Sequence, residues 1–233
     1  MTLELFNADC LEHMKTIADK SIDLIICDLP YGCLSGRAIG ETAEKKGCYS
    51  GSSNGCDWDI KLDLDAFWKQ IKRIRKDDHT PCIHFCSTKF GFDLIKSNEK
   101  EFRYDLVWNK KRGVGFLNIN KKPMNCHEMI YVFSNKGSNY NRIDIKGEPY
   151  NIISNSSKIY NTNIISTINT GTRCVLSIID EKKCAKKNQH PTEKPLELYK
   201  WLISRYSKES DKVLDPTFGS CNSGLACKEL KRN

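Results

Sequence analysis

The chain has 233 residues and a mass of 26.7 kDa, a size that fits one compact domain carrying an insertion. Hydrophobic residues make up 39% of the chain and charged residues 28%, which excludes collagen-like, repeat and disordered proteins. Its apolar runs are too short to cross a bilayer, and its first residues lack the pattern of a secretory signal. We therefore expect an intracellular, cytoplasmic protein in a reducing compartment, with no membrane partner.

Positive charge is concentrated in two segments. Lys and Arg number 37 against 29 Asp and Glu, which gives a net charge of +8. Residues 109–146 hold eight basic side chains and two acidic ones, Glu128 and Asp144, and a second basic run at residues 182–187 precedes His190. Such a surplus favours a polyanionic partner, because cations neutralise phosphates. Solvated basic loops have the same composition, so charge alone leaves both interpretations open.

The twelve cysteines contain no Cys-x-x-Cys pair. The tightest cluster, Cys82, His84 and Cys86, alternates along a predicted strand and would point to one face of a sheet. Structural zinc sites favour closer paired spacings. We interpret the cysteines as buried, reduced thiols and predict no metal site.

The first third of the chain predicts alternating strands and helices. Leu3–Phe6 has the composition of a short strand, and Asp9 followed by Glu12 resembles a capping box that opens a helix. The apolar run Ile22–Cys27 is typical of a strand buried on both faces. Residues 33–59 lack periodicity and predict a long loop, and residues 63–76 form an amphipathic pattern.

The middle of the chain continues this alternation. We expect strands at residues 82–86, 104–108 and 129–133 and a helix at residues 90–97. Strands that alternate with helices predict an α/β fold.

The rest of the chain first loses and then regains regular periodicity. Residues 135–189 are rich in Asn, Ser, Ile, Thr and Lys, so we expect an insertion with short strands at residues 164–168 and 175–179. A helix beginning at Pro195, a strand at Val213–Leu214 and a last helix carrying Leu225, Ala226 and Leu230 complete the order.

Two strand ends carry the polar residues that a ligand site needs. Asp28-Leu29-Pro30-Tyr31 follows the first buried strand, and the segment from Asp215 to Gly224 follows the last. In an open α/β sheet, ligands collect at the carboxyl ends of strands. Gly219 and Gly224 let a backbone approach a nucleoside or an amino acid closely, although a purely structural turn is an equal alternative.

The first of these ends has the groups needed to activate an exocyclic amine on a nucleobase. The Asp28 carboxylate and the Leu29 carbonyl can each accept one N–H of the amine, so that its nitrogen lone pair is freed from the ring. Pro30 exposes that carbonyl, and Tyr31 offers an aromatic face to a flipped base. An ordinary β-turn remains the alternative interpretation.

Three segments, in this order, resemble the catalytic, pre-helix and cofactor motifs of the S-adenosylmethionine-dependent DNA amino-methyltransferases of the permuted β group. They are Asp28-Leu29-Pro30-Tyr31, His190-Pro191-Thr192-Glu193-Lys194-Pro195 and Asp215-Pro216-Thr217-Phe218-Gly219-Ser220. The segment from Asn7 to Glu12 and the stretch from Trp108 to Glu128 are also similar. The likeness covers nearly the whole chain.

The resemblance implies an α/β fold: a Rossmann-like methyltransferase sheet with helices on both faces and an inserted target-recognition region. It implies a catalytic half of the core at residues 1–108, the last core strand plus a basic target-recognition insertion at 109–189, and a cofactor-binding half at 190–233. The family usually continues into a further strand that ends in an acidic residue, so we expect the C-terminal part of the sheet to be incomplete. Cys221 and Asn222 stand where the family usually has Gly and Thr.

The resemblance also implies residue roles. Catalysis falls to Asp28, Leu29, Pro30 and Tyr31. S-adenosylmethionine would be held by Asp9 at its adenine amine, by His190 and Lys194 at its methionine end, and by a pocket lined by Asp215, Phe218, Gly219 and Ser220. DNA phosphates would be bound by Lys110, Lys111, Arg112, Lys121 and Lys122. Helix capping is the structural alternative for Asp9 and His190.

The implied function is site-specific methylation of the exocyclic N6 of adenine in double-stranded DNA after base flipping. Family members that act on cytosine N4 more often carry Ser at the position of Asp28. The alternatives are an N4-cytosine methyltransferase and a DNA-binding protein with an inactive core. A homodimer, a restriction endonuclease partner and a bacterial, phage or viral origin are all compatible with this family.

Overall fold

The computed structural model describes residues 2–32, 59–154, 165–182 and 193–233. Among these residues, no helix is long and apolar enough to span a membrane. The elements, in chain order, are α1 (Cys10–Met14), β1 (Leu24–Cys27), α2 (Leu64–Ile74), β2 (Cys82–Cys86), α3 (Thr88–Ser97), η1 (Glu99–Glu101), β3 (Phe102–Val114), η2 (Phe116–Asn118), β4 (Asn125–Phe133), β5 (Ile145–Lys146), β6 (Tyr150–Ser154), β7 (Ile165–Asn169), β8 (Thr172–Arg173), β9 (Ile178–Asp180), α4 (Leu196–Tyr206), β10 (Val213–Leu214) and α5 (Asn222–Glu229).

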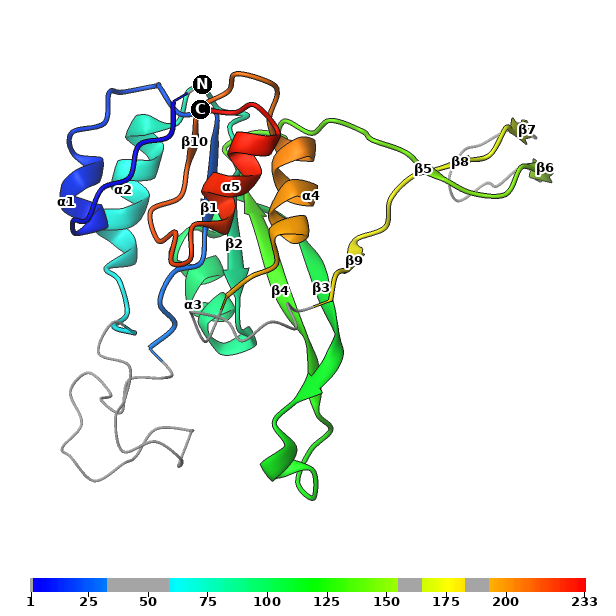
Figure 1. The fold of residues 1–233 in the computed structure, drawn as a ribbon, viewed down its shortest axis with the longest axis horizontal. Coiled ribbons are helices and arrows are strands. Elements are labelled where there is room, and N and C mark those ends of the chain that lie inside the picture. Colours follow the sequence, from blue (N-terminus) through cyan, green and yellow to red (C-terminus); the bar gives the residue numbers. More distant parts are fainter. Residues whose placement is uncertain (1, 33–58, 155–164, 183–192) are drawn as a thin grey trace.

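A mostly parallel six-stranded sheet organises the chain, in the order β10-β1-β2-β4-β3-β9 (Figure 1). β4 pairs antiparallel with both β2 and β3, and the remaining pairs are parallel. The carboxyl ends of β1, β2, β3 and β10 therefore point to one edge of the sheet. On the outer side of β10, the last residue, Asn233, donates its backbone N–H to Asp211 and accepts the N–H of Val213.

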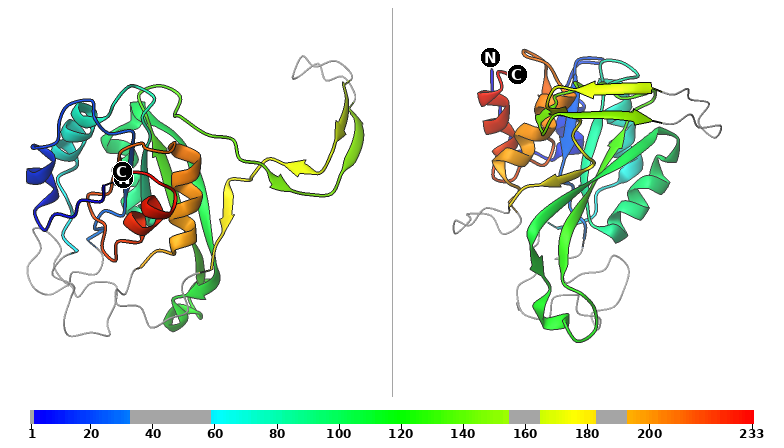
Figure 2. Two further views of the ribbon diagram at one scale, coloured as in Figure 1. Left: turned by 45° about the horizontal axis from the view of Figure 1, so that its top comes forward. Right: turned by 90° about the vertical axis from the view of Figure 1, so that its right-hand side faces the viewer.

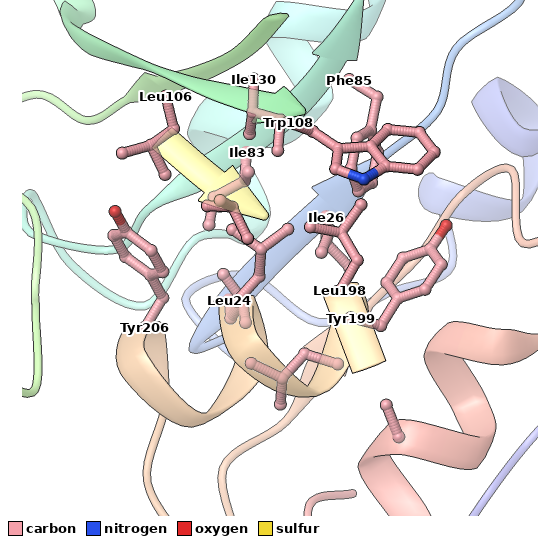
Figure 3. Packing of buried hydrophobic residues seen from close by; sticks show 14 of the residues in the cluster. Leu24, Ile26, Ile83, Phe85, Leu106, Trp108, Ile130, Leu198, Tyr199 and Tyr206 are labelled. Carbon is pink, nitrogen blue, oxygen red and sulfur yellow. The ribbon is translucent and has the colours of Figure 1, made fainter. Parts of the chain in front are cut away.

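Helices cover both faces of the sheet, which confirms the predicted α/β fold. Side chains on a strand alternate between faces. Leu24 and Ile26 of β1 therefore pack under α4 and α5 against Leu198 and Tyr206, in the cluster of Figure 3.

The other residues of the same strand face the second helical layer. Ile25 and Cys27 pack under α1, α2 and α3 with Phe67 and Ile71. A strand buried on both faces was the prediction for residues 22–27, and the fully buried pattern of β1 confirms it.

Several sequence expectations need correction. Leu3–Phe6 is not a strand: residues 2–8 have no regular hydrogen-bonded structure, and Leu3, Leu5 and Phe6 are exposed. The strand expected at 104–108 is longer, because β3 continues to Val114. The strand expected at 175–179 is displaced, since β9 begins at Ile178 and pairs with β3 at the sheet edge. Most of the loop predicted at 33–59 and the start of the strand expected at 164–168 lie outside the described residues.

Two parts of the chain project from this core (Figures 1 and 2). The ribbon of β3 and β4 extends beyond the carboxyl edge of the sheet. The short pairs β5–β8 and β6–β7 form an arm on the side of β9. Both belong to the segment expected to carry an insertion.

The contact between α3 and β4 has little spare room at Gly91. A methyl group added there would lie 2.4 Å from Tyr131 Cε2, whereas nothing lies within 4 Å of a methyl group added at Gly137. We expect Gly91→Ala to lower the free energy of unfolding by about 1–3 kcal/mol through overpacking. Urea unfolding of Gly91→Ala and of Gly137→Ala as the matched control checks this; equal stabilities would contradict it.

Candidate functional site

The site is built where β1 and β10 end side by side. The two strands pair in parallel, with Leu24 opposite Val213 and Ile25 opposite Leu214. Immediately beyond the strands, the backbone N–H of Asp28 donates to the hydroxyl of Thr217 at 3.2 Å. The two polar segments singled out in the sequence therefore share one edge and touch directly.

Asp28 is the centre of the first segment. Its Oδ1 accepts the Tyr31 hydroxyl at 2.9 Å, and its Oδ2 lies 2.5 Å from Lys194 Nζ. The Asp28 side chain is 20% exposed, so it borders the surface while both oxygens are held. Leu29 is buried and anchors the segment to the core.

Tyr31 is partly buried and stacks on Phe90, with ring centroids 5.2 Å apart. Burial and the nearby Asp28 carboxylate raise the pKa of Tyr31 well above its usual range. The phenol thus stays protonated and serves as the hydrogen-bond donor to Asp28. One ring face is already used by Phe90.

Four charged groups of alternating sign contact one another in sequence at this edge of the sheet: Lys110, Glu128, Lys194 and Asp28. Lys110 Nζ lies 2.6 Å from Glu128 Oε1, and Lys194 Nζ lies 3.5 Å from Glu128 Oε2. Lys194 is only 5% exposed and contacts carboxylates on two sides. We call these four residues the charged row.

Each charge in the row stabilises its neighbour. Burial would raise the pKa of Glu128, but the ammonium groups of Lys194 and Lys110 hold it below its usual value. Burial would likewise lower the pKa of Lys194, but Asp28 and Glu128 raise it. Both groups therefore stay charged in the folded protein, as buried ions do when each has a partner.

The second segment forms a strained turn between β10 and α5. Asp215 Oδ1 accepts the backbone N–H of Thr217 at 2.9 Å. Gly219 and Cys221 both have left-handed backbones, with φ of 49° and 62°. This conformation favours glycine. Glycine is the residue that the family named above usually has at the position of Cys221.

Asn222, the first residue of α5, ties this turn to the segment that carries Lys194. Its Nδ2 donates to the Lys194 carbonyl at 2.8 Å and to Glu193 Oε1 at 2.8 Å. The side chain that replaces the usual Thr thus joins the two motifs.

Among the described residues, the carboxyl of Asp215 has an incomplete set of hydrogen-bond partners and no cation paired with it as Glu128 has. Its Oδ2 is buried, and among the described residues it has no hydrogen-bond partner within bonding geometry. Burial raises the pKa of Asp215 to about 7, although the Ser223 hydroxyl and the Thr217 N–H oppose that effect. The carboxyl is therefore poised to accept a proton or a cation.

The other residues expected to hold a cofactor are more scattered. Asp9 caps α1, where its side chain accepts the Glu12 N–H at 3.0 Å. Phe218 is half-buried, and Gly219 and Ser220 are exposed, on the turn that follows Asp215. His190 lies outside the described residues.

The residues expected to bind DNA divide into two groups. Lys110 is buried in the charged row, which does not suit a phosphate contact. Lys111, Arg112, Lys121 and Lys122 are exposed on the β3–β4 ribbon. Of these, Lys111 forms an ion pair with Asp180 at 2.6 Å.

Sequence reasoning did not assign roles to Glu128, Asn222 or Phe90, each of which contacts an expected site residue. The signal for Glu128 was its position as the one acid between residues 106 and 143, within a stretch that holds several Lys and Arg. Asn222 and Phe90 gave no such signal, since their contacts depend on tertiary packing.

Cys27, Cys82 and His84 lie together inside the core, with one potential ligand atom each within 4.8 Å of one another. Cys82 Sγ lies 3.2 Å from His84 Nε2. Cys82 and Cys86 share one core cluster, and His84 packs on Phe67 and Trp68 of the same layer, as expected for alternate residues of one strand. All three groups are fully enclosed between the sheet and α2.

Comparisons with known proteins agree on a family. A family model described as DNA methylase matches residues 22–233. The type II methyltransferase M.HinfI of Haemophilus influenzae is 29% identical over 242 residues, and the match covers 98% of this chain and 62% of that protein. The chain thus spans less than two thirds of the length of this curated relative.

Solved structures share the fold. The M1.HpyAVI–SAM complex has a TM-score of 0.59 at 20% identity and covers 99% of this chain and 89% of that chain. The PvuII DNA methyltransferase, described as cytosine-N4-specific, has a TM-score of 0.62 at 15% identity, covering 97% of this chain and 78% of that chain. At these identities the likeness establishes the arrangement of the elements.

The raised pKa of Asp215 predicts a pH-dependent cost to stability. Between its ordinary pKa of 3.8 and about 7, the folded state binds a proton that the unfolded state releases, so the free energy of unfolding falls as pH rises through this window. We expect the free energy of unfolding of Asp215→Asn not to fall in this way. Above pH 7 it should exceed that of the wild type by up to about 4 kcal/mol. Urea unfolding at about pH 5 and about pH 8 checks this.

The matched control is Asp105→Asn, at an exposed position on β3. It makes the same substitution at a side chain that the core does not enclose. A constant difference for Asp215→Asn would contradict the prediction.

Proposed function

The chain belongs to the N6/N4 DNA methylase family, and on that premise we propose that it transfers a methyl group from S-adenosylmethionine to an exocyclic amine of a base in double-stranded DNA. The finer proposal is site-specific transfer to the N6 of adenine after base flipping. One observation carries the proposal of methyl transfer: Asp28 and the turn after Asp215 are joined by the hydrogen bond to Thr217. An acceptor for an amine and a cradle for a methyl donor are thus neighbours.

The turn after β10 fits the proposed cofactor. The buried Asp215 Oδ2, which lacks a hydrogen-bond donor within the described part of the chain, suits the amino group of the methionine moiety. Phe218, Gly219 and Ser220 on the same turn would line the pocket, and Asp9 would accept from the adenine amine. When bound, the cofactor supplies an electrophilic methyl group on a positively charged sulfur, and this chemistry needs no metal.

The role of Lys194 changes in the light of its contacts. The resemblance implied that Lys194 binds the carboxylate of the cofactor, but its ammonium group already contacts Asp28 and Glu128. We propose that Lys194 orients Asp28. His190 keeps its proposed place near the methionine end of the cofactor.

The steps at the target amine follow from the atoms of Asp28 and its neighbours. One Asp28 oxygen and the Leu29 carbonyl would accept the two N–H bonds, which lets the nitrogen become pyramidal and frees its lone pair. The target amine replaces the Tyr31 hydroxyl or shares Oδ1 with it. The surplus proton of the methylated amine leaves to water through Asp28.

Adenine is the proposed base because Asp, rather than Ser, precedes Leu29-Pro30-Tyr31. Incubation with DNA and isotopically labelled S-adenosylmethionine, followed by nucleoside analysis, tests this directly. N6-methyladenine is expected. Formation of N4-methylcytosine would change the proposed base to cytosine. If calorimetry detects no binding of S-adenosylmethionine while the chain still binds DNA, the chain is a DNA-binding protein with an inactive core.

Removing the proposed acceptor should separate chemistry from binding. We expect Asp28→Ala to lower methyl transfer by at least about 100-fold, while DNA affinity changes little. Asp93→Ala, which removes an exposed carboxylate paired with Lys61, serves as the matched control and should retain activity. Substantial transfer by Asp28→Ala in a labelled-methyl assay would refute the assigned role.

The exposed cations of the ribbon should act on phosphates. We expect Lys121→Ala combined with Lys122→Ala to weaken binding to all DNA sequences and to reduce the slope of log K against log salt by about 2. Binding titrations at several salt concentrations measure both quantities. The control is Lys100→Ala with Lys208→Ala, two exposed cations at the opposite edge of the sheet. A loss confined to one recognition sequence would contradict a phosphate role.

A further inference from the structure

The β3–β4 ribbon leads from the site directly to an exposed tip. β2 ends at Cys86, opposite Met129 of β4, whereas β3 and β4 stay paired beyond that point through Asn109–His127 and Val114–Asn125. The ribbon therefore extends past the sheet edge that carries Asp28 and the cofactor turn, as Figure 1 shows.

The tip of the ribbon exposes large apolar side chains instead of burying them. Leu117 is 90% exposed and Phe116 70%, and three further apolar residues lie beside them: Val114, Ile119 and Met124. Gly115, with φ of 92°, makes the turn that starts η2 and presents Phe116 and Leu117 outward. Five exposed large apolar residues within eleven positions of the chain indicate an interaction site.

The charge around the tip specifies the kind of partner. Exposed Arg112, Lys121 and Lys122 flank Phe116 and Leu117 in the sequence, and no Asp or Glu occurs from residue 110 to residue 127. A cationic rim of one sign attracts a polyanion. It also disfavours pairing with the same ribbon of a second copy, because like charges would meet.

We propose that the tip of the β3–β4 ribbon, Phe116 and Leu117 foremost, is a wedge that enters the base stack of double-stranded DNA beside the target and helps to open it. This inference rests on the proposed function and extends it. Apolar side chains are known to insert between base steps and to unstack them, at a cost of a few kcal/mol that new contacts offset. A base must leave the stack before an amine can reach Asp28.

The wedge predicts a loss of activity that depends on the state of the DNA. The substrate is a duplex that contains the target site, mapped by sequencing DNA from cells that express the chain. A second duplex has an abasic position opposite the target base, so that the pair is already open. We expect Phe116→Ala with Leu117→Ala to lower kcat/KM at least about tenfold on the intact duplex. On the opened duplex, the kcat/KM of this double variant should lie within about threefold of the wild-type value.

The matched control is Phe92→Ala with Leu5→Ala, which removes two exposed apolar side chains outside both the ribbon and the expected target-recognition insertion. This control should equal the wild type on both substrates. Circular dichroism of both double variants establishes that they are folded.

Three outcomes would overturn the wedge. The first is no loss of kcat/KM on the intact duplex, and the second is an equal loss of kcat/KM on both substrates. The third is that sedimentation shows a dimeric wild type and a monomeric double variant, so that dissociation explains the loss. The last outcome would make the tip an interface between copies of this chain. Failure of the proposed function is distinguishable, because the wild type would then methylate neither substrate. In that case the fluorescence of 2-aminopurine, placed in a bound duplex, tests the wedge without methyl transfer. The wild type should unstack the 2-aminopurine and raise its fluorescence, and the double variant should not.

Discussion

β1 and β10 stand far apart in the sequence and pair in parallel, and this pairing brings Asp28 to the turn that follows Asp215. The hydrogen bond from Asp28 to Thr217 joins residues 189 positions apart. Parallel neighbours end at the same edge of a sheet, so the proposed acceptor and the proposed cofactor turn meet there. Asn222 then fastens the turn to the segment that holds Lys194. Site geometry in this protein is therefore set mainly by strand order.

Buried charge is the second determinant of the site. An isolated ammonium with the burial of Lys194 would be costly, and the charged row makes it tolerable because each ion has an oppositely charged neighbour. Deleting one member leaves an unpaired charge beside Asp28, so the row restrains the conformation of the acceptor more than it adds stability. Asp215 lies outside the row, and within the described part of the chain its Oδ2 has no hydrogen-bond partner.

Much of this arrangement was predictable from local pattern. The apolar run at residues 22–27 predicted a doubly buried strand. The polar residues after it and after Val213–Leu214 were predicted to share one edge, and the structure brings them together there. Other features depended on partners that a single sequence does not reveal. Leu3–Phe6 has the composition of a strand but pairs with no strand among the described residues. Lys110 was expected to be a surface cation but is buried in an ion pair with Glu128. The length of β3 was missed because its outer half is stabilised by β4 instead of by an apolar core.

The ribbon leaves the core at an irregular step in its register between Asn109 and Val114, where Lys111 has a left-handed φ of 57°. Bulges of this kind fix a bend and increase twist, so the direction of the ribbon is a property of its backbone. For the proposed wedge, a tip held at a constant distance from Asp28 would fix the number of base steps between the point of entry and the reacting base, whatever sequence the duplex has there.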